Sequence, residues 1–135
     1  MTAGDTVVVD SSVIVAIFKR EADAADLMNR LVSFQKRIIS AASFFEAAIV
    51  CEEWAKPADP KEFDLMLAAL RLEIVPATQP QMEIARRAHR RFGKGRGKPA
   101  VLSFGDCFVY ALAKELGAPV LFKGDDFAQT DIEAA

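Results

Sequence analysis

Short apolar runs alternate with longer helical patterns along the whole chain, and this alternation constrains the fold more than any other feature. The runs that predict strands are Thr6–Val9, Ile38–Ile39, Leu72–Val75 and Pro119–Phe122. The segments that predict helices are Val13–Phe18, Ala22–Phe34, Phe44–Trp54, Pro60–Leu70, Gln79–Phe92 and Phe104–Leu116. This order is typical of a short parallel sheet flanked by helices on both faces. With 135 residues, 52% of them hydrophobic, the chain predicts one α/β domain over residues 1–135.

The composition excludes several functional classes. No uninterrupted apolar run approaches the ~18 residues of a membrane span, and the N-terminal MTAGDTVVVD lacks the pattern of a signal peptide. We therefore expect a cytoplasmic protein. Cys51 and Cys107 stand in no metal-like spacing and are expected to be reduced, buried thiols. A single histidine, His89, argues against a catalytic or metal site built on histidine.

Acidic residues follow the first and the last predicted strands. Asp10 comes directly after the first strand, and Asp125 and Asp126 come shortly after the last. Ligands of parallel sheets bind outside the carboxyl ends of the strands, so these acids meet at one edge if the two strands are neighbours. Structural interpretations stay open, since Asp10 also suits a helix N-cap and the Asp pair suits a turn after Gly124.

Two further acids stand near predicted helix starts. Ser43 to Glu46 and Ser103 to Asp106 both have the spacing of a capping box, in which the acid bonds back to the cap residue. The segment around Glu46 is apolar nearly all round, so we expect that helix to be buried. A buried carboxylate costs several kcal/mol unless it is paired, protonated or bound to a cation. For Glu46, capping and function therefore both remain open.

Taken together, these acids suggest a metal site. Helix N-termini stabilise single carboxylates by ~0.3–1 kcal/mol, which does not explain a cluster of them. Clustered carboxylates repel one another, and Mg²⁺ or Mn²⁺, which prefer oxygen ligands, would remove that conflict. Such ions activate water and stabilise charge in phosphodiester cleavage. Ser11 and Ser12 are candidates for supporting hydrogen bonds or for helix capping.

A basic segment lies on an otherwise acidic chain. Seven of the 17 Lys and Arg residues fall between Arg86 and Lys98, with no acid among them. The segment ends in a glycine-rich stretch that suits close approach to phosphates. We expect an anionic partner to be met by this segment, through the basic residues Arg91, Lys94, Arg96 and Lys98. The alternative is a solvated helix face that pairs with Glu52, Glu53 or Glu62.

The chain resembles the PIN-domain family, and within it the VapC toxins of bacterial toxin–antitoxin pairs. The resemblance rests on VVVDSSVIVAIF, SAASFFEAAIV, FGKGRGKPAVLSFGDCFVYALAKELG and PVLFKGDDFAQTDI, in the family's order. It implies a Mg²⁺- or Mn²⁺-dependent ribonuclease on a small α/β sandwich, usually dimeric. It also implies structured RNA, often tRNA, as substrate and a VapB-like antitoxin that blocks the acidic groove. With RNA as the anionic partner, we expect Arg91, Lys94, Arg96 and Lys98 to contact its backbone.

The family's carboxylates map onto Asp10, Glu46 and Asp106. The fourth position departs from the family's Thr-x-Asp pattern, because this chain has Lys123-Gly124-Asp125-Asp126. We expect Asp125 to be the fourth acid, with Asp126 as the second choice.

Other interpretations stay open. A PIN-like module that binds RNA or protein without cutting is one, and a small α/β phosphatase or receiver domain is another, although Asp10-Ser11-Ser12 lacks the Asp-x-Asp of many phosphatases. Phe44, Phe45 and Trp54 are expected in the core, with a dimer or antitoxin surface as the alternative.

Overall fold

The computed structural model describes residues 5–55, 59–93 and 102–135. In this part of the chain the elements are β1 (Thr6–Val9), α1 (Ser11–Phe18), α2 (Ala24–Val32), β2 (Lys36–Ser40), α3 (Ala41–Trp54), α4 (Pro60–Ala69), β3 (Leu72–Val75), α5 (Gln79–Phe92), α6 (Phe104–Leu116) and β4 (Val120–Leu121). The strands and helices follow the predicted order. None of the described helices is long and apolar enough to cross a membrane.

The strands form one parallel sheet in the order β3-β2-β1-β4. β1 occupies a central position, where Val8 pairs with Ile38 of β2 and with Val120 of β4. The valines of β1 are fully buried, as expected for a parallel strand covered on both faces. The order makes β1 and β4 neighbours, so the residues that follow these two strands emerge at the same edge of the sheet.

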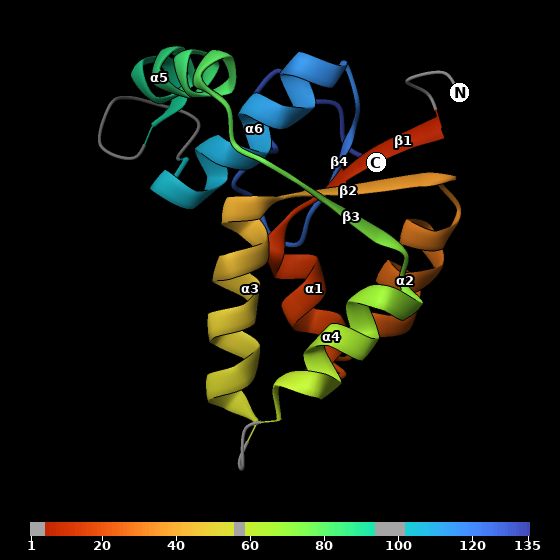
Figure 1. The fold of residues 1–135 in the computed structure, drawn as a ribbon. Helices are drawn as coiled ribbons and strands as arrows, with labels where there is room; N and C mark the ends of the chain where they lie inside the picture. Colours follow the sequence, from red (N-terminus) through yellow and green to blue (C-terminus); the bar gives the residue numbers. More distant parts are fainter. Residues whose placement is uncertain (1–4, 56–58, 94–101) are drawn as a thin grey trace.

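Helices cover both faces of the sheet (Figure 1), as predicted. Successive side chains of β1 point to opposite faces, so Val7 and Val9 pack in one core with residues of α1 to α4. Val8 packs in a second core with residues of α5 and α6, among them Tyr110 and Leu112. The two helix layers therefore meet near the sheet edge, where α1, α3 and the start of α6 come together.

Helix α3 departs from the prediction at its start. It begins at Ala41, and the side chain of Ser40 accepts a hydrogen bond from Ala42 N as the N-cap. Ser43 therefore lies inside the helix, and the predicted capping box between Ser43 and Glu46 is wrong. Buried Ser43 Oγ has no hydrogen-bond partner among the described residues.

The prediction that α3 is buried is also wrong for much of its surface. Phe45 and Trp54 are 65% and 54% exposed, and Ile49 is exposed as well. Phe44 alone of the three predicted aromatic core residues packs partly inward, with its ring 5.9 Å from that of Phe63. A helix that is apolar all round can thus be half exposed, because composition does not say which face lacks a partner in the same chain.

Candidate active site

Asp10 lies where β1 ends and α1 begins. Its backbone N–H donates to Leu121 O of β4 at 3.0 Å, and its Oδ2 accepts from Ser12 N at 3.0 Å. The predicted N-cap is therefore present. The side chain is buried, and burial raises the pKa of Asp10, with further increases from the charges of Glu46 and Asp126 and a partial offset from the Ser12 hydrogen bonds. Asp10 therefore caps α1 and also lies close to other acids.

Asp106 lies in the first turn of α6 and forms the predicted capping box. Its Oδ2 accepts from Ser103 N at 2.9 Å, and Ser103 Oγ accepts from Asp106 N at 3.2 Å. Burial raises the pKa of Asp106 to about 7, helped by a side-chain hydrogen bond with Asp126 and by the charges of Asp10 and Asp126. The Ser103 backbone bond opposes this increase. The charges of two acids from elements distant in sequence therefore act on the Asp106 carboxylate.

Asp126, not Asp125, is the acid of the C-terminal pair that meets this group. The charge of Asp126 raises the pKa of both Asp10 and Asp106, and its side chain bonds with Asp106. Among the described residues, no contact joins the Asp125 side chain to these acids; its backbone carbonyl accepts from Ala128 N. The structure therefore brings Asp126, rather than Asp125, close to Asp10 and Asp106.

Glu46 reaches the same place from α3. It is exposed, and its Oε1 accepts a 2.6 Å hydrogen bond from Ser11 Oγ, next to Asp10. A Cβ atom added at Gly105 would lie 2.9 Å from Glu46 Oε2, so the carboxylate also lies against the first turn of α6. The expected burial of Glu46 is wrong, and its carboxylate lies against Ser11 and Gly105, the sequence neighbours of Asp10 and Asp106.

Lys123 holds the loop that carries Asp126. Its backbone N–H donates to Ser12 Oγ at 3.0 Å, and its Nζ contacts Glu21 Oε1 at 2.5 Å and Asp23 Oδ1 at 3.0 Å. These partners are about one hundred positions away in sequence, so no local spacing signals them. Ser11 and Ser12 both take the supporting role considered from the sequence, one toward Glu46 and one toward this loop.

The donor set suits a hard divalent cation. Carboxylates that raise one another's pKa are stabilised by a nearby positive charge, and Mg²⁺ is usually held by one or two carboxylates with water completing the shell. Within the described ranges, no three His, Cys, Asp or Glu side chains converge closely enough to hold a metal ion together. Asp10 and Asp106 are the two buried carboxylates of the set, and the charges of Asp126 and Glu46 act on Asp10 from beside them.

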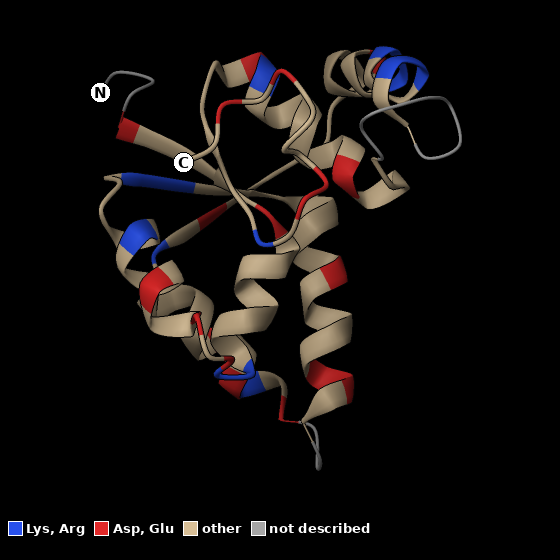
Figure 2. Ribbon diagram, turned by 180° about the vertical axis from the view of Figure 1, so that it is seen from behind, with Lys and Arg blue, Asp and Glu red and all other residues tan. Residues whose placement is uncertain are grey.

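The predicted RNA-contact residues are only partly within the described chain. Arg91 on α5 is exposed, lies 3.7 Å from Asp131 and stacks over Phe92, while Lys94, Arg96 and Lys98 lie outside the described residues. Figure 2 shows Lys and Arg gathered on α5 and several acids elsewhere on the surface. The alternative pairing with Glu52, Glu53 or Glu62 is not found in the described part; Arg86 pairs with Glu83.

Comparison with known proteins places this site in a family. The PIN domain family matches residues 7–133. A VapC ribonuclease of Mycolicibacterium smegmatis is 43% identical over 127 residues, covering 94% of this chain and 98% of the relative. Ribonuclease VapC28 of Mycobacterium tuberculosis is 39% identical over 128 residues, covering 95% of this chain and 96% of the relative.

A solved structure has the same fold. Mycobacterium tuberculosis VapC20, described as a toxin that cleaves the sarcin-ricin loop, superimposes with a TM-score of 0.72 at 15% identity. The match covers 96% of this chain and 98% of that one. At this identity the likeness shows the fold, and the relatives above show the family. The chain belongs to the PIN-domain family and, within it, to the VapC ribonucleases, the toxin components of VapBC toxin–antitoxin pairs.

Proposed function

We propose that the chain is a Mg²⁺- or Mn²⁺-dependent endoribonuclease that cuts structured RNA, tRNA among its targets, and so restricts translation in the cytoplasm. The observation that carries this proposal is that three acids from separate elements lie close enough for their charges to interact. They are Asp10 after β1, Asp106 in α6 and Asp126 after β4, and the charge of Asp126 raises the pKa of both Asp10 and Asp106. A fold that brings buried carboxylates together at the carboxyl edge of its sheet favours cation-assisted chemistry at that edge.

Asp10 and Asp106 would hold the cation, with Glu46 and Asp126 binding it directly or through water. The cation would supply an activated water and charge stabilisation at the scissile phosphate. Ser11 fixes the Glu46 carboxylate at 2.6 Å, and Ser103 fixes that of Asp106. Both acids are thereby oriented before substrate arrives. Because no histidine or ribose hydroxyl is needed, the products should carry 5′-phosphate and 3′-hydroxyl ends.

A VapB-like antitoxin is the proposed protein partner, and its binding would block the acidic edge. Trp54 and Leu65 are 54% and 70% exposed and border a groove of about 660 Å³ between α1, α3 and α4. An exposed apolar groove of this kind suits a protein partner. The groove lies at the C-terminal ends of α1 and α3, and it would give the antitoxin an anchoring surface on the two helices whose N-terminal parts hold the Asp10 cap and Glu46.

A homodimer is the proposed assembly. Phe45 and Ile49 form an exposed apolar strip on α3 that carries no basic side chain. Two copies can bury such strips against each other around a two-fold axis. Light scattering on the purified chain tests this proposal, and a monomer at all concentrations would contradict it.

Cleavage of a total small-RNA pool by purified protein tests the proposed activity. We expect cutting with Mg²⁺ or Mn²⁺, none with EDTA, and a fall of about two to three orders of magnitude in Asp10→Asn and Asp106→Asn. The matched control is Asp125→Asn, an acid on the same loop as Asp126 without contact to the site. Products with 2′,3′-cyclic phosphate ends, or cutting that survives EDTA, would contradict the proposal. RNA binding without hydrolysis would support the non-catalytic module, and turnover of a small phosphoester alone would support a phosphatase.

A further inference from the structure

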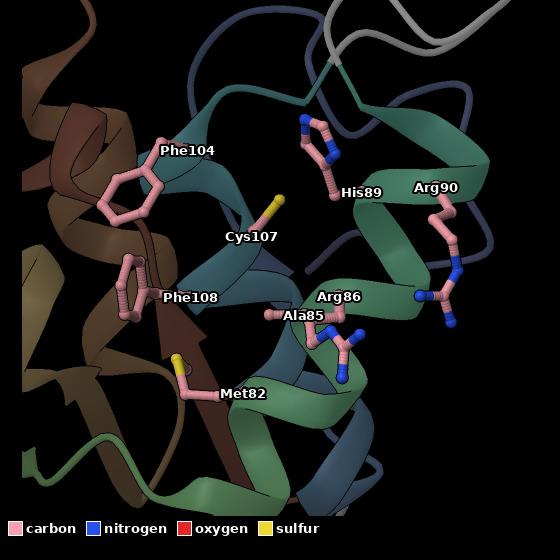
Figure 3. Close-up of a pocket in the computed structure, with 8 residues that line it drawn as sticks. All are labelled: Met82, Ala85, Arg86, His89, Arg90, Phe104, Cys107 and Phe108. Atoms are coloured by element: carbon pink, nitrogen blue, oxygen red, sulfur yellow. The ribbon is translucent and has the colours of Figure 1, made fainter.

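Another cavity is lined by residues of α5 and α6 and by none of the acids described above. It has a volume of about 430 Å³ and lies between α5 and α6. Figure 3 shows the residues that line it: Met82, Ala85, Arg86, His89 and Arg90 come from α5, and Phe104, Cys107 and Phe108 come from α6. Cys107 points toward α5, whereas the ring of Phe104 projects from the other side of α6. Its volume is within the range of ~300–1,000 Å³ typical of small-molecule sites. Nothing in the proposed chemistry at the acidic edge uses this cavity.

Phe104 is the most unusual residue of this cavity. Its side chain is 81% exposed, the highest value among the large apolar side chains of the described chain. Its ring meets that of Phe108 edge-to-face at 5.1 Å, so a neighbour holds it in place while one face stays open. An exposed and supported aromatic ring is a platform on which a nucleobase can stack, an interaction of ~1–3 kcal/mol per base.

The basic residues of the rim supply the complementary charge. Among the described residues, no acid lines the cavity, whereas Arg86, His89 and Arg90 do. Arg86 is paired with Glu83 at 2.9 Å, but Arg90 has no ion-pair partner among the described residues. An apolar floor with unpaired positive charge beside it suits a ligand that is flat and apolar at one end and anionic at the other. A nucleotide has this chemistry.

The position of Phe104 links the cavity to the acidic site. Phe104 and Asp106 lie in the first turn of the same helix, and Gly105 between them lies against the Glu46 carboxylate. Phe104 also lines an adjoining pocket together with Gly105 and Glu46, so the exposed ring and one of the acids border the same hollow. A strand with one phosphate at the acids can therefore place a neighbouring base at Phe104.

A second copy of the chain is a weaker candidate for this surface. A two-fold contact centred on the cavity would bring Arg86 and Arg90 toward the same residues of the partner, and like charges oppose such a contact. The strip of Phe45 and Ile49 on α3 has no such charge. The two surfaces therefore differ in the ligand that they suit.

We propose that the cavity between α5 and α6 is a base-binding subsite for a single-stranded nucleotide next to the scissile phosphate, with Phe104 as the stacking platform and Arg90 as a phosphate contact. The role of the subsite rests on the proposed function: it would select which unpaired base lies beside the cut. Its ligand is RNA with an unstacked base, such as a loop or bulge of a folded RNA.

Binding of labelled single-stranded RNA octamers, measured by fluorescence anisotropy, tests the subsite. The measurement uses the Asp10→Asn protein in EDTA, so that the probe is not cut. Adding Phe104→Ala should raise the Kd about tenfold, as loss of one stacked base implies, while Phe104→Tyr should stay within about twofold. Adding Arg90→Gln should weaken binding and reduce its salt dependence by about one phosphate contact.

Leu116→Ala is the matched control, because it removes an exposed apolar side chain from the far end of the same helix. It should leave the Kd unchanged. Equal affinity of the Phe104→Ala and parent proteins would overturn the proposal. So would a change of oligomeric state in Phe104→Ala without a change in RNA affinity, because the surface would then bind a second copy.

Cleavage of an RNA pool separates this proposal from the proposed function. If RNA binding by the Asp10→Asn protein depends on Phe104 but the wild-type protein does not cut RNA, the subsite is supported and the nuclease is contradicted. Suppose instead that wild-type and Phe104→Ala proteins both cut efficiently and prefer the same nucleotide beside the cut. This result would support the nuclease and overturn the subsite. The expected result is cutting by both, with the preference at one position flattened in Phe104→Ala.

Discussion

The starts of α3 and α6 carry the same sequence signature and have different structures. Ser43-x-x-Glu46 and Ser103-x-x-Asp106 both have capping-box spacing, but only the second forms a box. At α3 the strand runs directly into the helix, and Ser40 at the end of β2 caps it three residues earlier. Glu46 is therefore free to accept its hydrogen bond from Ser11, a residue of another helix.

The difference separates two ways of placing an acid. Asp106 is fixed by its own helix, so one side chain both caps α6 and contributes charge to the site. Glu46 is fixed by tertiary structure and does not cap α3. Substitutions at α6 should therefore affect stability and activity together unless the cap is preserved, and substitutions at Glu46 should affect activity alone.

Asp106→Asn should have the largest effect. The amide oxygen of Asn can still accept from Ser103 N, so α6 should remain capped, but the negative charge is lost. We expect RNA cleavage to fall by about two to three orders of magnitude, with the melting temperature unchanged or raised. Metal-dependent cleavage and thermal unfolding measure the two effects. A large loss of stability in this variant would show that the charge, not the hydrogen bond, holds the helix start.

The stability of the metal-free protein should depend on pH through Asp106. Its pKa is raised to about 7 in the folded chain from 3.8, so between these values the folded state binds more protons than the unfolded state. The stabilisation is complete below about pH 4 and is lost as the pH rises through about 7. Thermal unfolding in EDTA should show this decline, and Asp106→Asn should flatten it. An equally steep decline in the variant would assign the effect to another group.

Three serines test the capping difference directly. Ser40→Ala and Ser103→Ala should each lower the free energy of unfolding by about 1 kcal/mol, because each removes a cap. Ser43→Ala should cause no loss, because its buried hydroxyl has no partner in the described structure. Urea unfolding compares all three. A loss at Ser43 as large as that at Ser40 would contradict the observed start of α3.

Ser11→Ala should have the smallest effect and should act only on Glu46. Removing the 2.6 Å hydrogen bond leaves the Glu46 carboxylate free to rotate, and supporting residues of this kind change metal affinity or activity by about 10-fold. We expect a higher Mg²⁺ requirement with little change in melting temperature. Adding Ser11→Ala to Glu46→Gln should then cause no further loss, and additive losses would show that Ser11 acts elsewhere.

Much of the fold could be predicted from the sequence because the patterns that indicate strands and helices are local. The β-branched run before Asp10 and the amphipathic helices needed only their own neighbours to be recognised. The sequence predicted that Asp10 and the C-terminal acids would meet at one edge if the first and last strands were neighbours, and the observed order β3-β2-β1-β4 makes them neighbours. The start of α3 was missed because the sequence contains two serines, Ser40 and Ser43, that both suit an N-cap.

The rest depends on side-chain directions that the sequence does not encode locally. Choosing between Asp125 and Asp126 requires the path of a loop that Lys123 fixes through Glu21 and Asp23, far away in the chain. The exposure of Phe45 and Phe104 depends on which helix faces lack a neighbour. An apolar residue in an apolar helix predicts burial, and only packing shows where that burial does not occur.

Binding of Mn²⁺ to the purified protein, followed by the loss of the free-ion signal in electron paramagnetic resonance, tests most directly whether the carboxylates form one metal site. We expect binding by the wild-type protein, a large loss in Asp10→Asn and Asp106→Asn, a smaller loss in Asp126→Asn, and none in Asp125→Asn. Equal Mn²⁺ binding by all five proteins, or none by the wild type, would contradict the metal site at this edge of the sheet.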